Sequence, residues 1–544
     1  MMSKRCFTSN GKPVFPVGAQ VHNSSGYAAK DLDRAFLALK RMDGNTIEIP
    51  IAWETVEPRE GEFDFSSVRD IWQRVKEEGL YLIFLWFGTW KNGTEKYAPE
   101  WVKTNPDRFP KVQSPEGHRV SVLSSHCGET CKADAKAFAA LCAFLKELDP
   151  NQDTLIAVQV ENEPGIMNGP ARDYSPAAEA AFHAPLPELL VRSMESHPDS
   201  PVSKLWQEHG KSAEGWKSSF GPRAEEFFTA YSIASYINRV AEAGKEQLDI
   251  LMYANAWVDV HRLRMPGIDY PSGGPTGRVM DLWKWAGPSL DLLAPDIYQQ
   301  TTYDYLGVCE TYSRPDNPLF VPESGPQEWN ARYLFEAVGR YRSIGHCIFG
   351  VESMIEEDGT PAPGCEPAIG SMRILSAAAG GLLTWRELDI QVVNQEEFAL
   401  YQYMEFDGWV AMVRFTRSLA ALGFDNKDWN WHDYNHKDYQ VLQQKDNRRG
   451  RGLIVQTGPD EFHVAGDGFR VWFVPKSRVQ GEPFALLSSD FNLVRQIGYV
   501  SVEEGRFTMD GDFVAIRKRN GDEVDFGIWA EPDAGVVRAR LVMQ

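Results

Sequence analysis

Up to about residue 385 the chain alternates between short apolar runs and longer segments in which apolar residues recur every three or four positions. Short apolar runs predict buried strands, and the longer spacing predicts amphipathic helices such as 133–148. The run 80–87 (LYLIFLWF) is continuously apolar, which is typical of a parallel strand buried on both faces. The expected strands are 13–21, 45–51, 80–87, 155–160, 250–253, 290–297, 319–321 and 347–351.

These strands and the helices between them make eight strand–helix units. Repeated units of this kind predict a parallel sheet with right-handed crossovers, and eight of them predict an α/β fold closed as a (β/α)8 TIM barrel. An open dinucleotide-binding sheet is disfavoured, because the turn after the first strand (GAQVHNSSG) is not GxGxxG. We expect the catalytic barrel to occupy residues 1–400.

The sequence pattern changes from about Gly452, where short runs rich in strand-forming residues follow one another closely. Turn signals such as Asp467-Gly468 and Asn520-Gly521 separate these runs. The pattern predicts an all-β sandwich over residues 452–544, with one of its strands at 484–489. Residues 401–451 are expected to form a helical and polar connection between the two domains.

Composition narrows the possible partners. There are 56 Lys and Arg residues against 76 Asp and Glu residues, so the formal net charge is −20, and a nucleic-acid partner is disfavoured because phosphate would be repelled. No apolar run approaches the ~20 residues of a membrane span, so no membrane association is expected. The start of the chain has no apolar signal segment, which predicts a cytoplasmic protein if Met1 is the true start. The sequence leaves homo-oligomer formation open.

The seven cysteines are odd in number and sparse, which fits free thiols in a reducing compartment. His126, Cys127, Cys131 and Cys142 lie near one another in the sequence, but their spacing is too loose to indicate a zinc site. We therefore expect neither a metal nor another cofactor.

Two glutamates follow apolar strands at positions suited to catalysis. In a barrel the reactive side chains lie at the C-terminal ends of the strands. The fourth strand ends in ENEPG, with Glu163 before Pro164, and the seventh ends in VPES, with Glu323 after Pro322. Glycosidic cleavage needs one protonated and one ionised carboxyl group on either side of the bond. Glu163 and Glu323 are therefore the candidate catalytic pair, although a lone glutamate at a strand end is more often a solvated rim residue.

The N-E-P and P-E strand ends resemble those of clan A glycoside hydrolases. An ordered series of segments resembles the bacterial family 35 β-galactosidases that carry an appended C-terminal domain of unknown function: WETVEPREGEFDF, LWFGTWKNG, YPSGGP and NPLFVPE. The resemblance implies a retaining mechanism with Glu163 as acid/base and Glu323 as nucleophile. It also implies that Asn162 contacts the sugar 2-hydroxyl and that Tyr298 holds Glu323.

The sequence departs from the animal-type members of family 35, which bind galactose through an acidic residue in a C-A-E-W turn. The corresponding turn here is Phe87-Gly88-Thr89-Trp90. We therefore expect recognition of the sugar to be built differently. The further candidate binding residues are Trp90, Lys91, Asn92, His22, Asn23, Asn255, Trp257 and Glu352. His22 and Asn23 could equally cap a loop, and Trp257 could belong to the core.

The sequence thus predicts a retaining exo-β-galactosidase that releases terminal non-reducing β-D-galactose from oligosaccharides or glycosides, so its partner is a small carbohydrate. The long insertion 165–224 and the loop 258–277 are expected to wall the site and restrict it to chain ends. They could instead build a subunit interface. The rival functions are a clan A β-glycosidase acting on glucose, mannose, fucose or arabinose units, and a non-catalytic carbohydrate-binding barrel.

Overall fold

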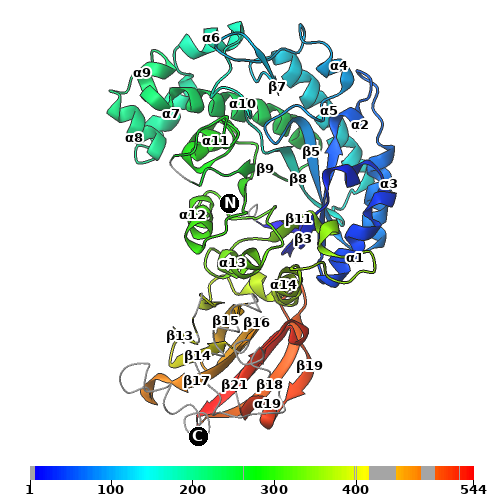
Figure 1. Cartoon of the computed structure of the whole chain (residues 1–544), viewed down its shortest axis with the longest axis vertical. Helices are drawn as coiled ribbons and strands as arrows, with labels where there is room; N and C mark the ends of the chain where they lie inside the picture. Colours follow the sequence, from blue (N-terminus) through cyan, green and yellow to red (C-terminus); the bar gives the residue numbers. More distant parts are fainter. Residues whose placement is uncertain are drawn as a thin grey trace.

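The computed structural model describes residues 6–260, 263–396, 399, 401–415, 449–478, 497–525 and 527–543. A parallel sheet lies at the centre of the larger part of the molecule (Figure 1), with strand order β10-β9-β8-β5-β4-β3-β11. Its strands are β3 (Val17–Gln20), β4 (Thr46–Ala52), β5 (Tyr81–Lys91), β8 (Leu155–Asn162), β9 (Leu251–Trp257), β10 (Leu292–Asp296) and β11 (His346–Phe349). Each of them falls on a run that the apolar pattern predicts.

Residues 319–324 occupy the remaining strand position, the seventh in chain order, and close the sheet into a barrel. Single parallel bridges join this segment to its neighbours, Ile297 with Ser324 on the side of β10 and Val321 with His346 on the side of β11. The amide of Ile297 donates to the carbonyl of Glu323 at 2.8 Å, and that of Cys347 donates to Val321 at 2.8 Å. The predicted (β/α)8 barrel is therefore confirmed, with its seventh strand reduced to bridges.

Each strand position is followed by a helix that packs its apolar face on the outside of the sheet. In α1, for example, Ala35, Phe36, Ala38 and Leu39 are buried, while Asp33 and Lys40 face solvent. The eight helices are α1 (Asp33–Arg41), α3 (Ser66–Glu77), α5 (Gly128–Leu148), α10 (Ala224–Gln247), α11 (Met280–Ala286), α12 (Thr302–Tyr312), α13 (Glu328–Gly339) and α14 (Glu366–Thr384).

Shorter elements decorate the barrel. The insertion after β8 forms a group of helices that stands apart from the barrel axis at the top of Figure 1. They are α6 (Pro176–His183), α7 (Glu188–Ser196), α8 (Pro201–Glu208) and α9 (Trp216–Phe220). The remaining short elements are β1 (Phe7–Ser9), β2 (Lys12–Val14), α2 (Trp53–Val56), α4 (Glu100–Lys103), β6 (Lys111–Gln113) and β7 (Arg119–Leu123). Every helix among the described residues is too short or too polar to span a bilayer.

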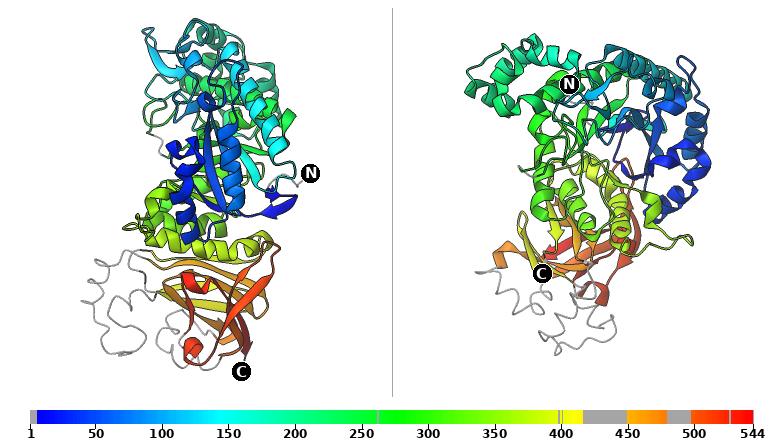
Figure 2. Two further views of the ribbon diagram at one scale, coloured as in Figure 1. Left: turned by 90° about the vertical axis from the view of Figure 1, so that its right-hand side faces the viewer. Right: turned by 45° about the horizontal axis from the view of Figure 1, so that its top comes forward.

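The C-terminal part is a sandwich of two antiparallel sheets (Figure 2). One sheet contains β12 (Ile390–Asn394), β15 (Arg451–Gly458), β16 (Glu461–Asp467), β21 (Val536–Met543), β18 (Ile497–Phe507) and β19 (Phe513–Arg519). The other contains β13 (Tyr401–Glu405), β14 (Trp409–Phe415), β17 (Phe469–Pro475) and β20 (Ile528–Ala530). Phe462 and Phe473 stack between the sheets, with ring centroids 4.1 Å apart, in an apolar core shared by both.

The expected helical and polar connection over 401–451 is wrong at both of its ends. Residues 401–405 and 409–415 form β13 and β14, and β15 begins at Arg451. Even β12, which lies before residue 400, pairs with β15. Pairing of distant segments places these strands in the sandwich, which local polarity does not reveal. Residues 416–448 of the expected connection and the expected strand 484–489 lie outside the described residues.

The sandwich packs directly under the last helices of the barrel (Figure 2), with α14 resting on β16 and β18 and α13 on β12 and β15. Arg451, which is fully buried, crosses this junction. Its Nη2 donates to the carbonyl of Pro367 in α14 at 2.9 Å, and its Nε donates to the hydroxyl of Ser371 at 2.6 Å. It also pairs with Asp467 at 3.0 Å.

Candidate active site

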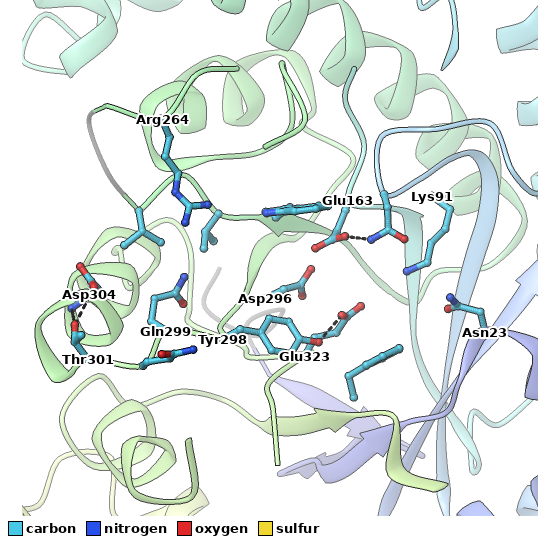
Figure 3. Close-up of a pocket in the computed structure, with 16 residues that line it drawn as sticks. Asn23, Lys91, Glu163, Arg264, Asp296, Tyr298, Gln299, Thr301, Asp304 and Glu323 are labelled. Atoms are coloured by element: carbon cyan, nitrogen blue, oxygen red, sulfur yellow. Dashed lines mark hydrogen bonds between the residues drawn. The ribbon is translucent and has the colours of Figure 1, made fainter. Parts of the chain in front are cut away.

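A cavity of about 760 Å³ opens at the C-terminal ends of the barrel strands (Figure 3). Both predicted catalytic glutamates line it, Glu163 from the end of β8 and Glu323 from the segment between β10 and β11. Figure 3 shows their carboxyl groups pointing into the same space. The two strand ends therefore meet as the barrel topology requires.

The turn that carries Glu163 holds an unusual backbone. Glu161 and Glu163 have φ values of 64° and 42°, in the left-handed region that residues with a side chain seldom adopt. The amide of Glu163 donates to Oδ1 of Asn255 at 2.8 Å, and Asn92 Nδ2 donates to the Glu163 carboxylate. Strained backbone of this kind persists only where the surroundings enforce it, and it clusters at functional sites.

Glu161 turns away from the cavity and anchors β5 instead. Its carboxylate accepts hydrogen bonds from the amides of Thr89 at 3.1 Å and Trp90 at 2.7 Å. Asp134 of α5 lies beside it, and its carboxylate accepts from the hydroxyl of Thr89 at 2.6 Å. Burial, followed by the charge of Asp134, raises the pKa of Glu161. These two buried carboxyl groups fix the loop that presents Lys91 and Asn92.

Glu323 is surrounded by hydrogen-bond donors. Tyr298 donates its hydroxyl to one carboxylate oxygen at 3.0 Å, and Asn162 donates its amide to the other at 3.3 Å. Lys91 Nζ in turn donates to Oδ1 of Asn162 at 2.8 Å, which fixes the orientation of that amide. Donors of this kind stabilise an ionised carboxylate.

A third carboxyl group, that of Asp296 at the end of β10, lies between the pair in Figure 3. Its Oδ2 accepts from Asn255 Nδ2 at 2.8 Å, so one asparagine side chain holds both Asp296 and the backbone of Glu163. Oδ1 of Asp296 is buried with no hydrogen-bond donor among the described residues. Burial, then the charges of Glu323 and Glu163, raises the pKa of Asp296 well above its ordinary value.

The two catalytic candidates have different surroundings. Burial, followed by the charge of Glu323, raises the pKa of Glu163 to about 7, while Lys91 opposes the shift. Glu163 therefore carries a proton in mildly acidic solution and is about half protonated near pH 7, as suits a group that serves as acid and then as base. Among the described contacts, Glu323 accepts hydrogen bonds from Tyr298, Asn162 and, at 3.5 Å, Asn255.

The structure separates the predicted sugar-binding residues into two groups. Asn23, Lys91, Asn92 and Trp257 line the cavity, and Asn162, Tyr298 and Asn255 hold its carboxyl groups. The other three are His22, Trp90 and Glu352, and none of them is among the residues that line the cavity.

Those three residues make structural contacts instead. Glu352 accepts from the backbone amide of His22 at 3.1 Å and from the hydroxyl of Ser25 at 2.6 Å, so it caps the loop after β3. The His22 ring bonds Ser353 at 2.7 Å. The Trp90 ring is buried against Tyr236, with centroids 4.8 Å apart.

The two long loops also differ in their relation to the site. The loop 258–277 lines the cavity with Val258, Val260 and Arg264, whereas the insertion 165–224 contributes no residue to the lining. Arg172 of that insertion stacks over Tyr174 and pairs with Glu179, so these polar residues hold the insertion together. The expectation that both loops wall the site is therefore wrong for the insertion.

Several lining residues outside the expected loop 258–277 were not foreseen: Asp296, Gln299, Gln300, Thr301, Asp304 and Phe349. A signal was available for Asp296, because alternate residues of a strand face the same side and it precedes Tyr298 by two. Among the described residues no cluster of three or more His, Cys, Asp or Glu side chains is arranged to hold a metal ion.

The barrel with its paired glutamates has the form of a glycosidase site, and residues 26–197 match a glycoside hydrolase family model. They match the family 42 model, described as β-galactosidase, and residues 373–531 match a domain of unknown function, DUF5597. The expected family 35 is not supported, because the glycoside hydrolase model that matches the chain is that of family 42. No curated protein matches the chain.

Solved structures similar to the chain include glycosidases of several kinds. The catalytic domain of β-amylase from Paenibacillus polymyxa is 15% identical over 65% of this chain and 97% of that one, with a TM-score of 0.47. β-Galactosidase from Bacillus circulans sp. alkalophilus is 14% identical over 68% and 57%, with a TM-score of 0.47. An exo-β-1,4-mannosidase from Opitutaceae bacterium strain TAV5 is 14% identical over 70% and 63%, with a TM-score of 0.44. The chain thus spans less than two thirds of the β-galactosidase and the mannosidase.

Proposed function

We propose that the protein is a retaining exo-β-galactosidase that removes terminal β-D-galactose from oligosaccharides or glycosides. The observation that carries this proposal is the pair of buried glutamates in one cavity, which have different hydrogen-bond partners. Burial and the neighbouring carboxylate raise the pKa of Glu163 to about 7, and Glu323 accepts hydrogen bonds from Tyr298 and Asn162. The family 42 match over residues 26–197 supports galactose as the sugar.

In the first step Glu323 attacks the anomeric carbon and forms an ester bond to it. The bond from that carbon to the leaving oxygen breaks, and the proton of Glu163 passes to that oxygen. Tyr298 and Asn162 hold the nucleophile in one orientation, at 3.0 and 3.3 Å from its two oxygens. Asn92 stabilises the carboxylate that Glu163 becomes.

In the second step water attacks the same carbon and displaces Glu323, while Glu163 takes the proton from the water. Glu163 has then returned to its starting state, and the configuration of the sugar is retained. This sequence calls on no group beyond the two carboxyls, water and the donors around them.

The experiment that tests the proposal begins with hydrolysis of nitrophenyl β-glycosides of galactose, glucose, mannose, fucose and arabinose. We expect the highest kcat/KM for the galactoside, and a 2-deoxy-2-fluoro galactoside should label the peptide that contains Glu323. Glu323→Ala should reduce the rate by about 10³-fold or more, because the covalent path has no substitute. Labelling of another residue, or an inverted product seen by NMR, would contradict the retaining assignment.

Glu163→Ala provides the matched test of the acid. It should slow substrates with poor leaving groups far more than activated aryl galactosides, since only the former need the proton. Added azide should restore turnover and yield β-galactosyl azide. Equal losses on both substrate types would exclude Glu163 as the acid.

A further inference from the structure

A second cavity of about 580 Å³ adjoins the catalytic one. It lies between helix α12 and the loop that follows β9, and it includes Tyr303, Leu306 and Gly307 of that helix. Val258, Val260 and Asp304 line both cavities, so the two spaces share a wall. Each volume lies within the roughly 300–1,000 Å³ of small-molecule sites.

The second cavity extends from the side of the site on which the leaving group must lie. Lys91 and Asn23 stand at one end of the catalytic cavity in Figure 3, and Gln299, Thr301 and Asp304 stand at the other. Lys91 is buried and fixes Asn162 against Glu323, so the first end is built around the sugar that the nucleophile attacks. The leaving group therefore departs towards Asp304 and the second cavity.

The surface of the second cavity suits a sugar ring. Tyr303 leaves 86% of its area exposed, which is high for a large aromatic side chain, and it presents both a flat apolar face and a hydroxyl. Polar groups also line the second cavity. They are Glu310, Thr311 and the ion pair of Arg278 with Asp259, which is 2.7 Å long. An apolar platform with polar groups at its edge is typical of small-ligand sites.

We propose that the second cavity is a binding site for the leaving-group sugars, so that the substrate is an oligosaccharide with two or more units beyond the cleaved bond. The proposal rests on the proposed glycosidase function and adds a substrate class to it. Tyr303 contacts a sugar remote from the reaction, and the binding energy of that sugar contributes to kcat/KM. Disaccharides and aryl glycosides fill the catalytic cavity alone.

Gly307 gives a direct test, because a Cβ added there meets no heavy atom within 4 Å. Gly307→Trp fills the second cavity without disturbing the helix, and Gly307→Ala is the matched control. The substrates are the di-, tri- and tetrasaccharides of the β-glycosyl unit that is cleaved best as a nitrophenyl glycoside. β-1,4-Galactose oligomers are the expected series.

For the wild type, kcat/KM should rise by roughly tenfold from the disaccharide to the longer oligomers, the effect of one good aromatic contact. Gly307→Trp and Tyr303→Ala should abolish this rise and leave the disaccharide and the nitrophenyl glycoside unchanged. Tyr303→Phe and Gly307→Ala should retain it.

The outcomes separate the two proposals. If no nitrophenyl glycoside is hydrolysed, the proposed function fails. If a nitrophenyl glycoside is hydrolysed but kcat/KM does not increase with chain length, only the second cavity's role is overturned. Equal losses on short and long substrates in Tyr303→Ala would also overturn it, because they would show a structural role.

Discussion

Asp296 influences how readily Glu163, the proposed acid/base, releases its proton. Its Oδ2 accepts from Asn255, and its Oδ1 is buried with no hydrogen-bond donor in the part of the chain that the structure describes. Burial, then the charges of Glu323 and Glu163, raises the pKa of Asp296, and the Asp296 side chain in turn forms a hydrogen bond with Glu163. That bond favours the ionised form of Glu163 and so lowers the pKa of Glu163.

Two substitutions of Asp296 should therefore have different effects on the pH profile. Asp296→Asn retains a donor and an acceptor, so the basic limb of kcat/KM, expected near pH 7 where Glu163 ionises, should stay in place. Asp296→Ala removes the donor, so that limb should move to higher pH, and substrates with poor leaving groups should slow most. If Asp296→Asn shifts the basic limb and slows these substrates as much as Asp296→Ala does, Asp296 acts through its negative charge and not as a hydrogen-bond donor.

Sequence alone identifies the chemistry of the site better than its walls. Glu163 and Glu323 follow apolar strands and are preceded or followed by proline, so local pattern and barrel topology place them together. Arg264, Gln299 and Phe349 line the cavity from loops and strand ends whose course depends on tertiary packing. Glu352 has the same strand-end signature as the catalytic pair, yet it caps the loop at His22.

Among the elements, α14 is the helix on which the two halves of the molecule meet. A Cβ at Gly380 would lie 1.7 Å from the carbonyl oxygen of Thr508, in the turn between β18 and β19. The absence of a side chain is therefore what allows this turn to approach the helix. At position 380, space for this turn matters more than the lower helix propensity of glycine.

Gly380→Ala and Gly307→Ala make a matched pair of helical substitutions. The first should lower the free energy of unfolding by roughly 1–3 kcal/mol, because backbone must move to remove the clash. The second lies in open space and should raise the free energy of unfolding by about 0.5–1 kcal/mol through helix propensity. Denaturant titrations of both variants would measure the difference, and a stabilised Gly380→Ala would show that the turn packs less closely than described.

Elements could be predicted from the sequence where their signal is local. The barrel strands appear as apolar runs and helices such as 133–148 as periodic segments, so these elements could be predicted. β12, β13 and β14 were not, because they join a sandwich whose other strands begin at Arg451. Their pairing is a long-range event, and the polar residues that follow Phe415 suggested a connection instead.

At the scale of the whole molecule, the buried guanidinium of Arg451 joins the sandwich to the barrel. It pairs with Asp467 and donates to Pro367 and Ser371 of α14. Arg451→Met should lower the free energy of unfolding by roughly 3–5 kcal/mol, since it removes a buried ion pair with Asp467 and the hydrogen bonds to Pro367 and Ser371. Arg540→Met is the control, because its pair with Glu461 is 3.9 Å long and more than half exposed on the arginine side, and it should change stability by less than about 1 kcal/mol. Similar losses in both variants would argue against an anchoring role.

The seventh strand position has a consequence for how the barrel moves. Single bridges join residues 319–324 to the neighbouring strands. Among the described contacts, the amide of Val321 is the only amide of this segment that donates to a backbone carbonyl, at 3.4 Å. Local openings of lowest free energy occur where backbone hydrogen bonds are fewest. In native-state hydrogen exchange the amides around Glu323 should therefore exchange before those of β4 and β5. On gradual heating, turnover should be lost before the far-ultraviolet circular dichroism changes, because the segment that bears the nucleophile loosens first.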